Sequence, residues 1–346
     1  MIKTKIYFIC PNNKFASGGV KQIYRQVELL NKNGFNAVVL HKKAIKESWF
    51  SHQIPVEISP YIFKKLKYLY SNKKVDFFKN ATLEFLKKKS AKIEKNSILV
   101  FPEIYGPKIY EIEKGTRKVI FNQNCYYTFE HYSLFQNTSE NPYLHQDTIA
   151  TICCSEDAEN YLEFTFPHAR ILRMALGIDS EIFSLSENKK KLIAFMPRKL
   201  SDDVTQVINI LRQRNFLSDW EFASIEDKTE REVAEIMKQS AIYLSFNYRE
   251  GFGLPPVEAM ATGCYVIGYC GQAGKEYMKK EFSSPVEDGN IISFVEKIEE
   301  AIEMYVNDPN DLLLKGKLAS NFVLENYNLN NEEKDITRIW SEILNV

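Results

Sequence analysis

Short apolar runs alternate with amphipathic segments from the start of the chain. Residues 2–10 end in five apolar side chains and predict a buried strand. After Gly18-Gly19, apolar residues recur with helical spacing over 20–30, which predicts a helix. Residues 35–40 predict the next strand, and the order strand, helix, strand implies a parallel, right-handed crossover. Later strands are expected at 97–101, 118–122 and 148–154.

The same alternation returns in the second half of the chain. A helix is expected to begin near Pro255-Pro256, because proline fits the first turn, and to end at Gly263. Helices predominate from residue 291 onward. The other expected elements are strands at 192–196, 220–225, 241–246 and 264–269, and helices over 204–211 and 233–237.

This repetition predicts an α/β protein with two Rossmann-like domains, each a parallel sheet covered by helices. A length of 346 residues also fits two domains. With the seam near 172–186, we expect an N-terminal domain at 1–176, a C-terminal domain at 177–328 and a final helix at 329–346. Because ligands of such sheets bind outside the carboxyl ends of the strands, we expect a cleft between the domains.

Charge is distributed unevenly, although the whole chain is neutral. Residues 1–120 contain 24 Lys and Arg against 9 Asp and Glu, a net +15, so the remaining residues carry −15. A neutral chain is not expected to bind nucleic acid through its overall charge.

Residues 60–95 are the most basic stretch, with 11 Lys and no Arg against Asp76, Glu84 and Glu94. Apolar and aromatic residues are interleaved with these lysines, as in helices that lie on an anionic bilayer. A helix packed on its own sheet with its lysines in solvent would give the same pattern, so both interpretations stay open. The absence of Arg argues against a nucleic-acid surface.

Composition indicates neither a membrane span nor a secretory signal nor a metal site. No apolar run approaches the roughly 18 residues of a membrane span, and the apolar stretch near the start is shorter than that of a signal peptide. The six cysteines form no CxxC pair, and the histidines lack ligand spacing. We therefore expect a cytoplasmic protein with buried thiols and no protein-held metal.

The clearest chemistry lies in the segment 250–263, EGFGLPPVEAMATG, between two predicted strands. Gly251 and Gly253 let the backbone approach a ligand closely. The helix that follows exposes unpaired amides and its positive dipole end, which together form a seat for phosphate. Phosphate repels Glu258, one turn into the helix, so we expect this residue to accept from ribose hydroxyls. Glu250 is expected to accept hydroxyls from whatever group the phosphate carries.

This segment resembles the E-x7-E region of family-4 retaining glycosyltransferases, which have the GT-B fold. Three other stretches are similar to that family: GGV at 18–20, FMPRK at 195–199 and GQAGKE at 271–276. The resemblance covers nearly the whole chain and is strongest over 190–290. It implies two facing Rossmann-like domains, with the final helix crossing back to the N-terminal domain.

The resemblance also implies roles for individual residues. Glu250 is expected to contact the donor sugar as the catalytic residue, and Glu258 to hold the ribose. The diphosphate is expected to lie against Arg198 and the amides of Gly253 and Leu254. The remaining donor-binding residues implied by the family are Gly18, Gly19, Lys199, Gly251 and Phe252.

Two positions depart from the family's pattern. A second basic residue commonly follows the arginine by five positions, where this chain has Asp203; Lys199 is expected to substitute, because its long side chain can reach the same oxygens. A first-domain strand end that often carries histidine reads Asn122-Gln123-Asn124. These amides can contact a sugar or acceptor but cannot act as bases at neutral pH.

Taken together, the resemblance implies a retaining glycosyltransferase that moves a hexosyl or deoxyhexosyl unit from a nucleotide-diphosphate sugar to a hydroxyl. The expected acceptor is a glycan or lipid-linked molecule of surface polysaccharide or glycoconjugate synthesis. We expect no metal, no cofactor and no nucleic-acid partner, and a place at the inner face of the membrane, where residues 60–95 touch anionic lipid. Two alternatives stay open: a catalytically silent binding or scaffold subunit of the same fold, and a glycosidase that uses the two carboxylates.

Overall fold

Two compact units make up the chain. In a computed structural model, unit 1 comprises Met1–Met174 and Glu333–Val346, and unit 2 comprises Ala175–Glu332. The boundaries expected from the sequence were 176/177 and 328/329. The structure describes residues 4–13, 17–44, 52–71, 77–132, 134, 141–217 and 219–345.

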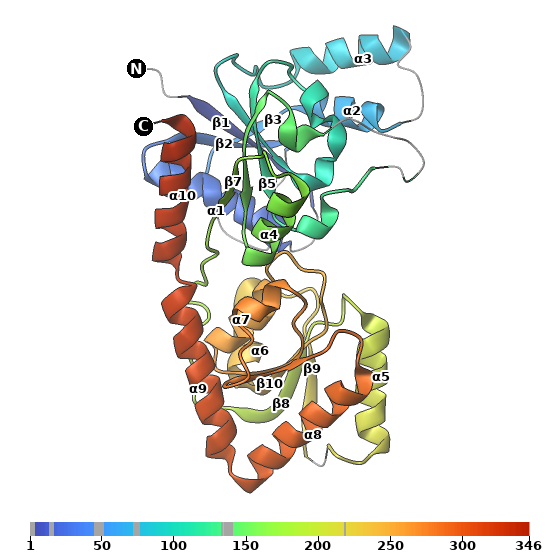
Figure 1. The fold of residues 1–346 in the computed structure, drawn as a ribbon, viewed down its shortest axis with the longest axis vertical. Coiled ribbons are helices and arrows are strands. Elements are labelled where there is room, and N and C mark those ends of the chain that lie inside the picture. The colour runs from blue at the N-terminus through green and yellow to red at the C-terminus, as the bar shows by residue number, and fades with distance from the viewer. Residues whose placement is uncertain are drawn as a thin grey trace. The chain divides into compact units, whose positions relative to one another are not determined.

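Unit 1 contains a parallel sheet in the order β3-β2-β1-β4-β5-β6-β7 (Figure 1). Its central strands are buried almost throughout, as expected of a parallel sheet with both faces covered. The strands are β1 (Lys5–Ile9), β2 (Asn36–His41), β3 (Val56–Ile58), β4 (Ile98–Pro102), β5 (Arg117–Asn122), β6 (Thr148–Cys153) and β7 (Ile171–Arg173).

The first helix of unit 1 buries the predicted stripe of Val20, Ile23, Val27 and Leu30. The α-helices described in the unit's first part are α1 (Gly18–Lys32), α2 (Pro60–Leu69), α3 (Phe77–Lys88) and α4 (Glu156–Thr165). Short 3-10 turns connect the later strands: η1 (Glu103–Tyr105), η2 (Pro107–Glu111), η3 (Cys125–Tyr127) and η4 (Pro142–Leu144).

Unit 2 contains a second parallel sheet, in the order β12-β11-β10-β8-β9. Its strands are β8 (Lys190–Phe195), β9 (Glu221–Ser224), β10 (Ser240–Ser245), β11 (Tyr265–Tyr269) and β12 (Ser283–Val286). Its helices are α5 (Ser201–Gln213), α6 (Glu230–Gln239), α7 (Leu254–Ala261), α8 (Ile291–Asn307) and α9 (Pro309–Asn326), with the 3-10 turn η5 (Ala273–Glu276).

Two parallel sheets covered by helices confirm the predicted fold class. The sequence pattern missed β3, β7 and β12, which are only three or four residues long. It also extended the first strand too far: β1 ends at Ile9, and residues 1–3 lie outside the described part. Five of the six cysteines are buried, and all six are free thiols.

The last helix, α10 (Leu329–Leu344), packs into the core of unit 1. Trp340 is fully buried, and its ring centroid lies 5.7 Å from that of Phe8 on β1. Ion pairs join Lys32 to Glu333 at 2.6 Å and Arg170 to Glu342 at 2.6 Å. The end of the chain is therefore part of the same core as its beginning.

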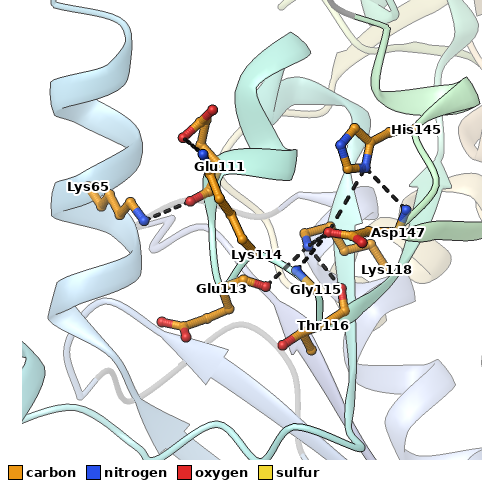
Figure 2. A network of polar contacts seen from close by, with 9 residues as sticks. All are labelled: Lys65, Glu111, Glu113, Lys114, Gly115, Thr116, Lys118, His145 and Asp147. Atoms are coloured by element: carbon orange, nitrogen blue, oxygen red, sulfur yellow. Dashed lines mark hydrogen bonds and ion pairs between the residues drawn. The ribbon is translucent and has the colours of Figure 1, made fainter.

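A polar network holds the amino end of β5 (Figure 2). The Lys118 side chain is completely buried, and its ammonium donates to the carbonyl of Thr116 at 2.9 Å and pairs with Asp147 at 3.4 Å. Asp147 also accepts the amide of Gly115 at 2.9 Å. Burial alone would raise the pKa of Asp147, but the Gly115 amide and the Lys118 ammonium together lower it.

Candidate functional site

The segment 250–263 joins β10 to β11 in unit 2, at the carboxyl end of β10. Gly251, Phe252 and Gly253 are all buried. The Phe252 ring packs against Tyr277 and Tyr327, with ring centroids 5.3 Å apart in each case. Of the predicted donor-binding residues, Phe252 can therefore offer a ligand only its main chain.

Gly253 is the N-cap of α7 and has a φ of +89°, a left-handed conformation that favours glycine. A Cβ at this position would lie 2.6 Å from the hydroxyl of Tyr277. That hydroxyl donates toward the carbonyls of Phe252, at 2.9 Å, and Gly253, at 3.1 Å. Backbone conformation and close packing thus both require glycine here.

Tyr277 also fixes the direction of two amides. In a trans peptide the N–H points away from the C=O, and the described residues contain no cis peptide. Because Tyr277 holds the carbonyls of Phe252 and Gly253, the amides of Gly253 and Leu254 point away from this buried ring. The sequence analysis did not identify Tyr277, although it directly follows the GQAGKE turn.

The two amides are the only main-chain donors among the first four positions of α7. The N-cap is Gly253 and the first helical residue is Leu254, while the next two residues, Pro255 and Pro256, have no N–H. Neither amide can bond within the helix, so both are available to an anion at the positive end of the helix dipole. The amides of Gly253 and Leu254, which were predicted to contact the diphosphate, are therefore the main-chain donors that the start of α7 can offer.

Glu250 lies in the loop before α7, with 28% of its side chain exposed. One of its oxygens, Oε1, accepts from both the ammonium of Lys199 and the side-chain amide of Asn247. Lys199 follows β8, so this contact joins the loops at the carboxyl ends of two neighbouring strands. Two residues predicted separately, one for the sugar and one for the diphosphate, thus meet in the folded chain.

Glu258 is half-buried on α7. Burial raises the pKa of Tyr243 on β10 well above its usual value, and the nearby carboxylates of Glu258 and Glu250 add to this shift. Both predicted carboxylates therefore lie close enough to one buried side chain to influence its ionisation.

Arg198 is exposed, and no hydrogen bond or ion pair engages it within the described parts of the chain. A guanidinium in this state can bind a phosphate without first leaving a protein partner. Asp203 stands where the family commonly has a second basic residue. Its carboxylate accepts a hydrogen bond from the hydroxyl of Tyr269 on β11 at 2.9 Å. This acidic side chain therefore has a partner within unit 2.

In unit 1, Gly18 and Gly19 form the first two residues of α1. The sequence analysis placed this pair ahead of the helix; the structure corrects that boundary, with Ser17 as the N-cap. A Cβ on Gly19 would lie 3.3 Å from the side-chain oxygen of Gln123, which follows β5. A contact between these glycines and phosphate stays a prediction.

The three amide residues at the carboxyl end of β5, Asn122, Gln123 and Asn124, have different environments. Asn122 is completely buried, and its amide donates to Thr128 at 2.9 Å and to Tyr143 at 2.8 Å. Asn124 accepts the amide of Tyr126 at 3.1 Å, which caps η3. Gln123 alone is partly exposed, so it is the only one of the three positioned to contact a ligand without rearrangement.

Glu103, at the carboxyl end of β4, is a buried acid that the sequence analysis did not identify. Its Oε2 accepts the amide of Gln123 at 3.0 Å. Burial raises its pKa to about 7, although hydrogen bonds from main-chain amides oppose the shift. No pattern in the sequence marks this residue, because its partner comes from the next strand of the sheet.

Part of unit 2 matches a known family. Residues 224–317 fit the sequence model described as Glycosyl transferases group 1. The matched region includes Glu250, the start of α7 and Tyr277. This part of unit 2 is therefore similar to the glycosyltransferase group 1 domain.

One curated relative matches about a third of the sequence. The Alpha-1,6-glucosyltransferase of Actinobacillus pleuropneumoniae serotype 7 (strain AP76) is 30% identical over 125 residues, which is 35% of this chain. The match spans 37% of the length of that protein.

Solved structures of similar fold extend over nearly the whole chain. A mutant of S. aureus TarM in complex with Fondaparinux, alpha-GlcNAc-glycerol and UDP has a TM-score of 0.68 at 12% identity, covering 99% of this chain and 100% of that chain. The pneumococcal O-GlcNAc transferase GtfA in complex with UDP and GlcNAc has a TM-score of 0.66 at 11% identity, covering 100% of both. Sucrose-phosphate synthase from Thermosynechococcus elongatus has a TM-score of 0.68 at 13% identity, covering 99% and 100%. At these identities the likeness shows the fold, two parallel-sheet α/β domains of the GT-B type.

Proposed function

We propose that this chain is a retaining glycosyltransferase that moves a hexosyl or deoxyhexosyl unit from a nucleotide-diphosphate sugar to a hydroxyl. The observation that carries the proposal is the start of α7, where Tyr277 directs two free amides away from itself beside the carboxylate of Glu250. This arrangement lies inside the group 1 domain. TarM and GtfA, which share the fold, have been solved with UDP.

The geometry supports a mechanism without a protein nucleophile. Breaking the bond between sugar and diphosphate moves negative charge onto the leaving diphosphate, and donors already directed at that charge lower the barrier. We propose that the amides of Gly253 and Leu254, with Arg198, are these donors, and that Glu258 holds the ribose. The acceptor hydroxyl attacks from the face that the diphosphate leaves, and its proton passes to the departing phosphate.

In this mechanism Lys199 changes its partner from Glu250 to the donor diphosphate. In the structure its ammonium pairs with Glu250. We propose that donor diphosphate draws Lys199 to its oxygens, which leaves Glu250 to accept from hydroxyls of the donor sugar and to stabilise the positive charge that develops on its reacting carbon. Because amides, Arg198 and Lys199 supply the positive charge at the diphosphate, the transfer we propose requires neither a metal nor a cofactor.

For the acceptor we propose a hydroxyl of a glycan or lipid-linked molecule in surface polysaccharide or glycoconjugate synthesis, at the inner face of a membrane. The partly exposed Gln123, beside Gly19, is the side chain we assign to acceptor contact in unit 1. The basic residues within 60–95 support the membrane location.

A thermal-shift series with UDP, GDP and dTDP tests the nucleotide site first. A ligand at a hundred times its Kd stabilises the folded protein by about 2.7 kcal/mol, which gives a clear rise in Tm. The nucleotide that stabilises most then identifies the sugar nucleotides for a turnover assay. If no nucleotide diphosphate raises the Tm, the site does not bind donor; hydrolysis of simple glycosides without nucleotide would favour the glycosidase instead.

Glu250→Gln separates catalysis from binding. We expect turnover to fall at least about a hundredfold while the nucleotide-induced rise in Tm persists, since Gln keeps the shape of the side chain but loses its charge. Glu281→Gln, an exposed residue outside the site, is the matched control and keeps full activity. Normal turnover by Glu250→Gln would show that Glu250 is not catalytic. Nucleotide binding without turnover in the unaltered chain would instead indicate a catalytically silent binding or scaffold subunit.

A further inference from the structure

Helix α3 (Phe77–Lys88) leaves its aromatic side chains in solvent. None of its residues is buried, and the exposed fractions are 80% for Phe77, 80% for Phe78 and 55% for Phe85. Isolated apolar residues are common on protein surfaces, but three phenylalanines on one short helix form a contiguous apolar patch. Such a patch requires an explanation beyond the packing of unit 1.

Two of the three rings share one exposed face of α3, and the third adjoins them at the start of the helix, where the ring centroids of Phe77 and Phe78 are 6.0 Å apart. Phe78 and Phe85 are two turns apart and so lie on the same side of the helix, with Phe77 next to them. Leu83 and Leu86 are half-buried, and α3 packs against α2. Figure 1 shows α3 on the outer side of α2, away from the strands of its own unit.

Exposed lysines lie at the end of α3 and just after it. Lys87, Lys88, Lys89 and Lys92 are exposed, and no ion pair neutralises any of them among the described residues. The ammonium of Lys89 lies 4.3 Å from the centroid of the Phe85 ring, so positive charge and apolar surface adjoin directly. The predicted segment 60–95 therefore does place a basic, amphipathic surface in solvent; its residues 72–76 lie outside the described part.

We propose that α3 docks on an anionic bilayer, with Phe77, Phe78 and Phe85 at the boundary between headgroups and acyl chains and Lys88, Lys89 and Lys92 on lipid phosphates. Phenylalanine on one face with lysine beside it is the pattern of helices that lie in the membrane interface. The proposal rests on the proposed function in one respect: a bilayer surface is where a lipid-linked acceptor is presented.

A protein partner fits the same surface less well. Protein interfaces are depleted in lysine, whereas lysine dominates the charged residues around the patch. One exposed face of a helix of 12 residues also offers less area than the roughly 800 Å² per partner of a stable interface. Charge complementarity and size therefore both favour lipid.

Vesicle flotation with the full chain tests the docking. We expect the protein to float with vesicles of equal parts phosphatidylcholine and phosphatidylglycerol at low salt, and not with pure phosphatidylcholine. High salt should reduce binding strongly, because the lysine contribution is screened. Absence of flotation with the anionic vesicles at low salt overturns the proposal.

Serine substitution tests the aromatic contribution. The triple variant Phe77→Ser, Phe78→Ser, Phe85→Ser should bind anionic vesicles at least about a hundredfold more weakly, since three buried rings are lost. Folding should be unaffected, because these rings are exposed in the free protein. The matched control is Phe164→Ser on α4, whose ring is 91% exposed but lies among acidic residues; it should bind as the unaltered chain does.

Charge reversal tests the lysines. Lys88→Glu, Lys89→Glu and Lys92→Glu together should weaken binding by about fivefold or more for each residue changed. A control with the same change in net charge elsewhere should lose far less, which separates a local surface from overall charge. The control substitutions, all at exposed positions, are Lys228→Glu, Lys280→Glu and Lys334→Glu.

The outcomes separate this proposal from the proposed function. Each variant is also tested by thermal shift with the nucleotide that stabilises the unaltered chain, and all should respond equally, since α3 is in unit 1 and α7 in unit 2. A nucleotide response without vesicle binding overturns the docking alone, and vesicle binding without a nucleotide response overturns the transferase alone. Unchanged vesicle binding by both the serine and the glutamate variants also refutes the docking through α3.

Discussion

At the scale of single residues, Tyr277 determines whether two amides face a ligand. Its hydroxyl donates toward the carbonyls of Phe252 and Gly253. We expect Tyr277→Phe to weaken nucleoside diphosphate binding about fivefold, because the freed peptides can rotate away from the phosphate, and to lower the free energy of unfolding by about 1 kcal/mol. Isothermal titration and urea unfolding measure the two effects.

Tyr265→Phe is the matched control for that change. The Tyr265 hydroxyl, on β11, bonds Ser284 at 2.8 Å and does not contact the start of α7. Its loss should cost similar stability with no change in nucleotide affinity. Unaltered affinity in Tyr277→Phe would show that the amides keep their direction without this hydroxyl.

Glu103 makes the stability of unit 1 depend on pH. Its pKa in the folded protein is about 7, above the ordinary value near 4.5, so folding favours the protonated form. Its contribution is fully present below about pH 4.5 and is lost as the pH rises through 7. We expect Glu103→Gln to match the unaltered chain near pH 5 and to exceed it by about 2–3 kcal/mol near pH 8.

Urea unfolding at both pH values measures this difference. Other titrating groups, including the buried His41, cancel because they are the same in both proteins. Glu28→Gln, at an exposed position of α1, is the matched control. An equal stability gap at the two pH values would mean that Glu103 does not titrate in this range.

The residues found from sequence and those missed differ in how far away their partners lie. Glu250 and Gly253 were predicted because a strand end, two glycines and a helix start adjoin within a few residues, and the family resemblance implied Leu254. Tyr277 is 24 and 25 residues from the carbonyls it holds, and Glu103 is 20 residues from Gln123. Only the pairing of strands brings such partners together, so no local pattern could identify them.

At the scale of elements, long buried segments were predictable and short ones were not. The apolar periodicity of α1 and the apolar runs of β5 and β10 can each be recognised from the residues of that segment alone. β3 and β7 have three residues each and are not fully buried, so they leave no pattern that differs from a loop. The start of α1 was misplaced because glycine, a poor helix former, was assigned to a turn.

The network at the amino end of β5 (Figure 2) acts at this scale, because it joins the strand to the segment before β6. Lys118→Met leaves Asp147, whose side chain is 11% exposed, without its cation. We expect the free energy of unfolding to fall by about 3 kcal/mol. Lys190→Met, at the exposed start of β8, is the control and should change stability little.

The pH dependence of that loss has a definite sign. The pKa of Asp147 is lowered in the folded protein, so its contribution is present above the ordinary value near 4 and is lost as the pH falls through the folded pKa. The difference between Lys118→Met and the unaltered chain should therefore shrink in acid. A difference that grows as the pH falls would contradict the pairing of Lys118 with Asp147.

At the scale of the whole molecule, the chain leaves unit 1 at Met174 and returns to it at Glu333. The sequence alternation predicts the first boundary at 176/177. The return was expected only from the family resemblance, because the stripe of Ile336, Ile339, Trp340 and Ile343 on the last helix predicts burial without saying against what. The residues that cover this apolar stripe come from the other end of the sequence, on β1 and α1.

Trp340→Ala tests whether the packing of α10 against β1 and α1 stabilises unit 1. The side chain is fully buried, contacts Phe8 and donates to Gln26 at 3.5 Å, so its loss should lower the stability of unit 1 by about 3–5 kcal/mol. Hydrogen exchange should accelerate in β1 and α1 but not in β8 and β10, and the nucleotide site of unit 2 should keep its affinity. Trp220→Ala, a buried tryptophan before β9, is the matched control and should give the reverse distribution. Equal acceleration in both sheets after Trp340→Ala would mean that the two units unfold as one, because a single cooperative unit transmits any loss of stability to all of its strands.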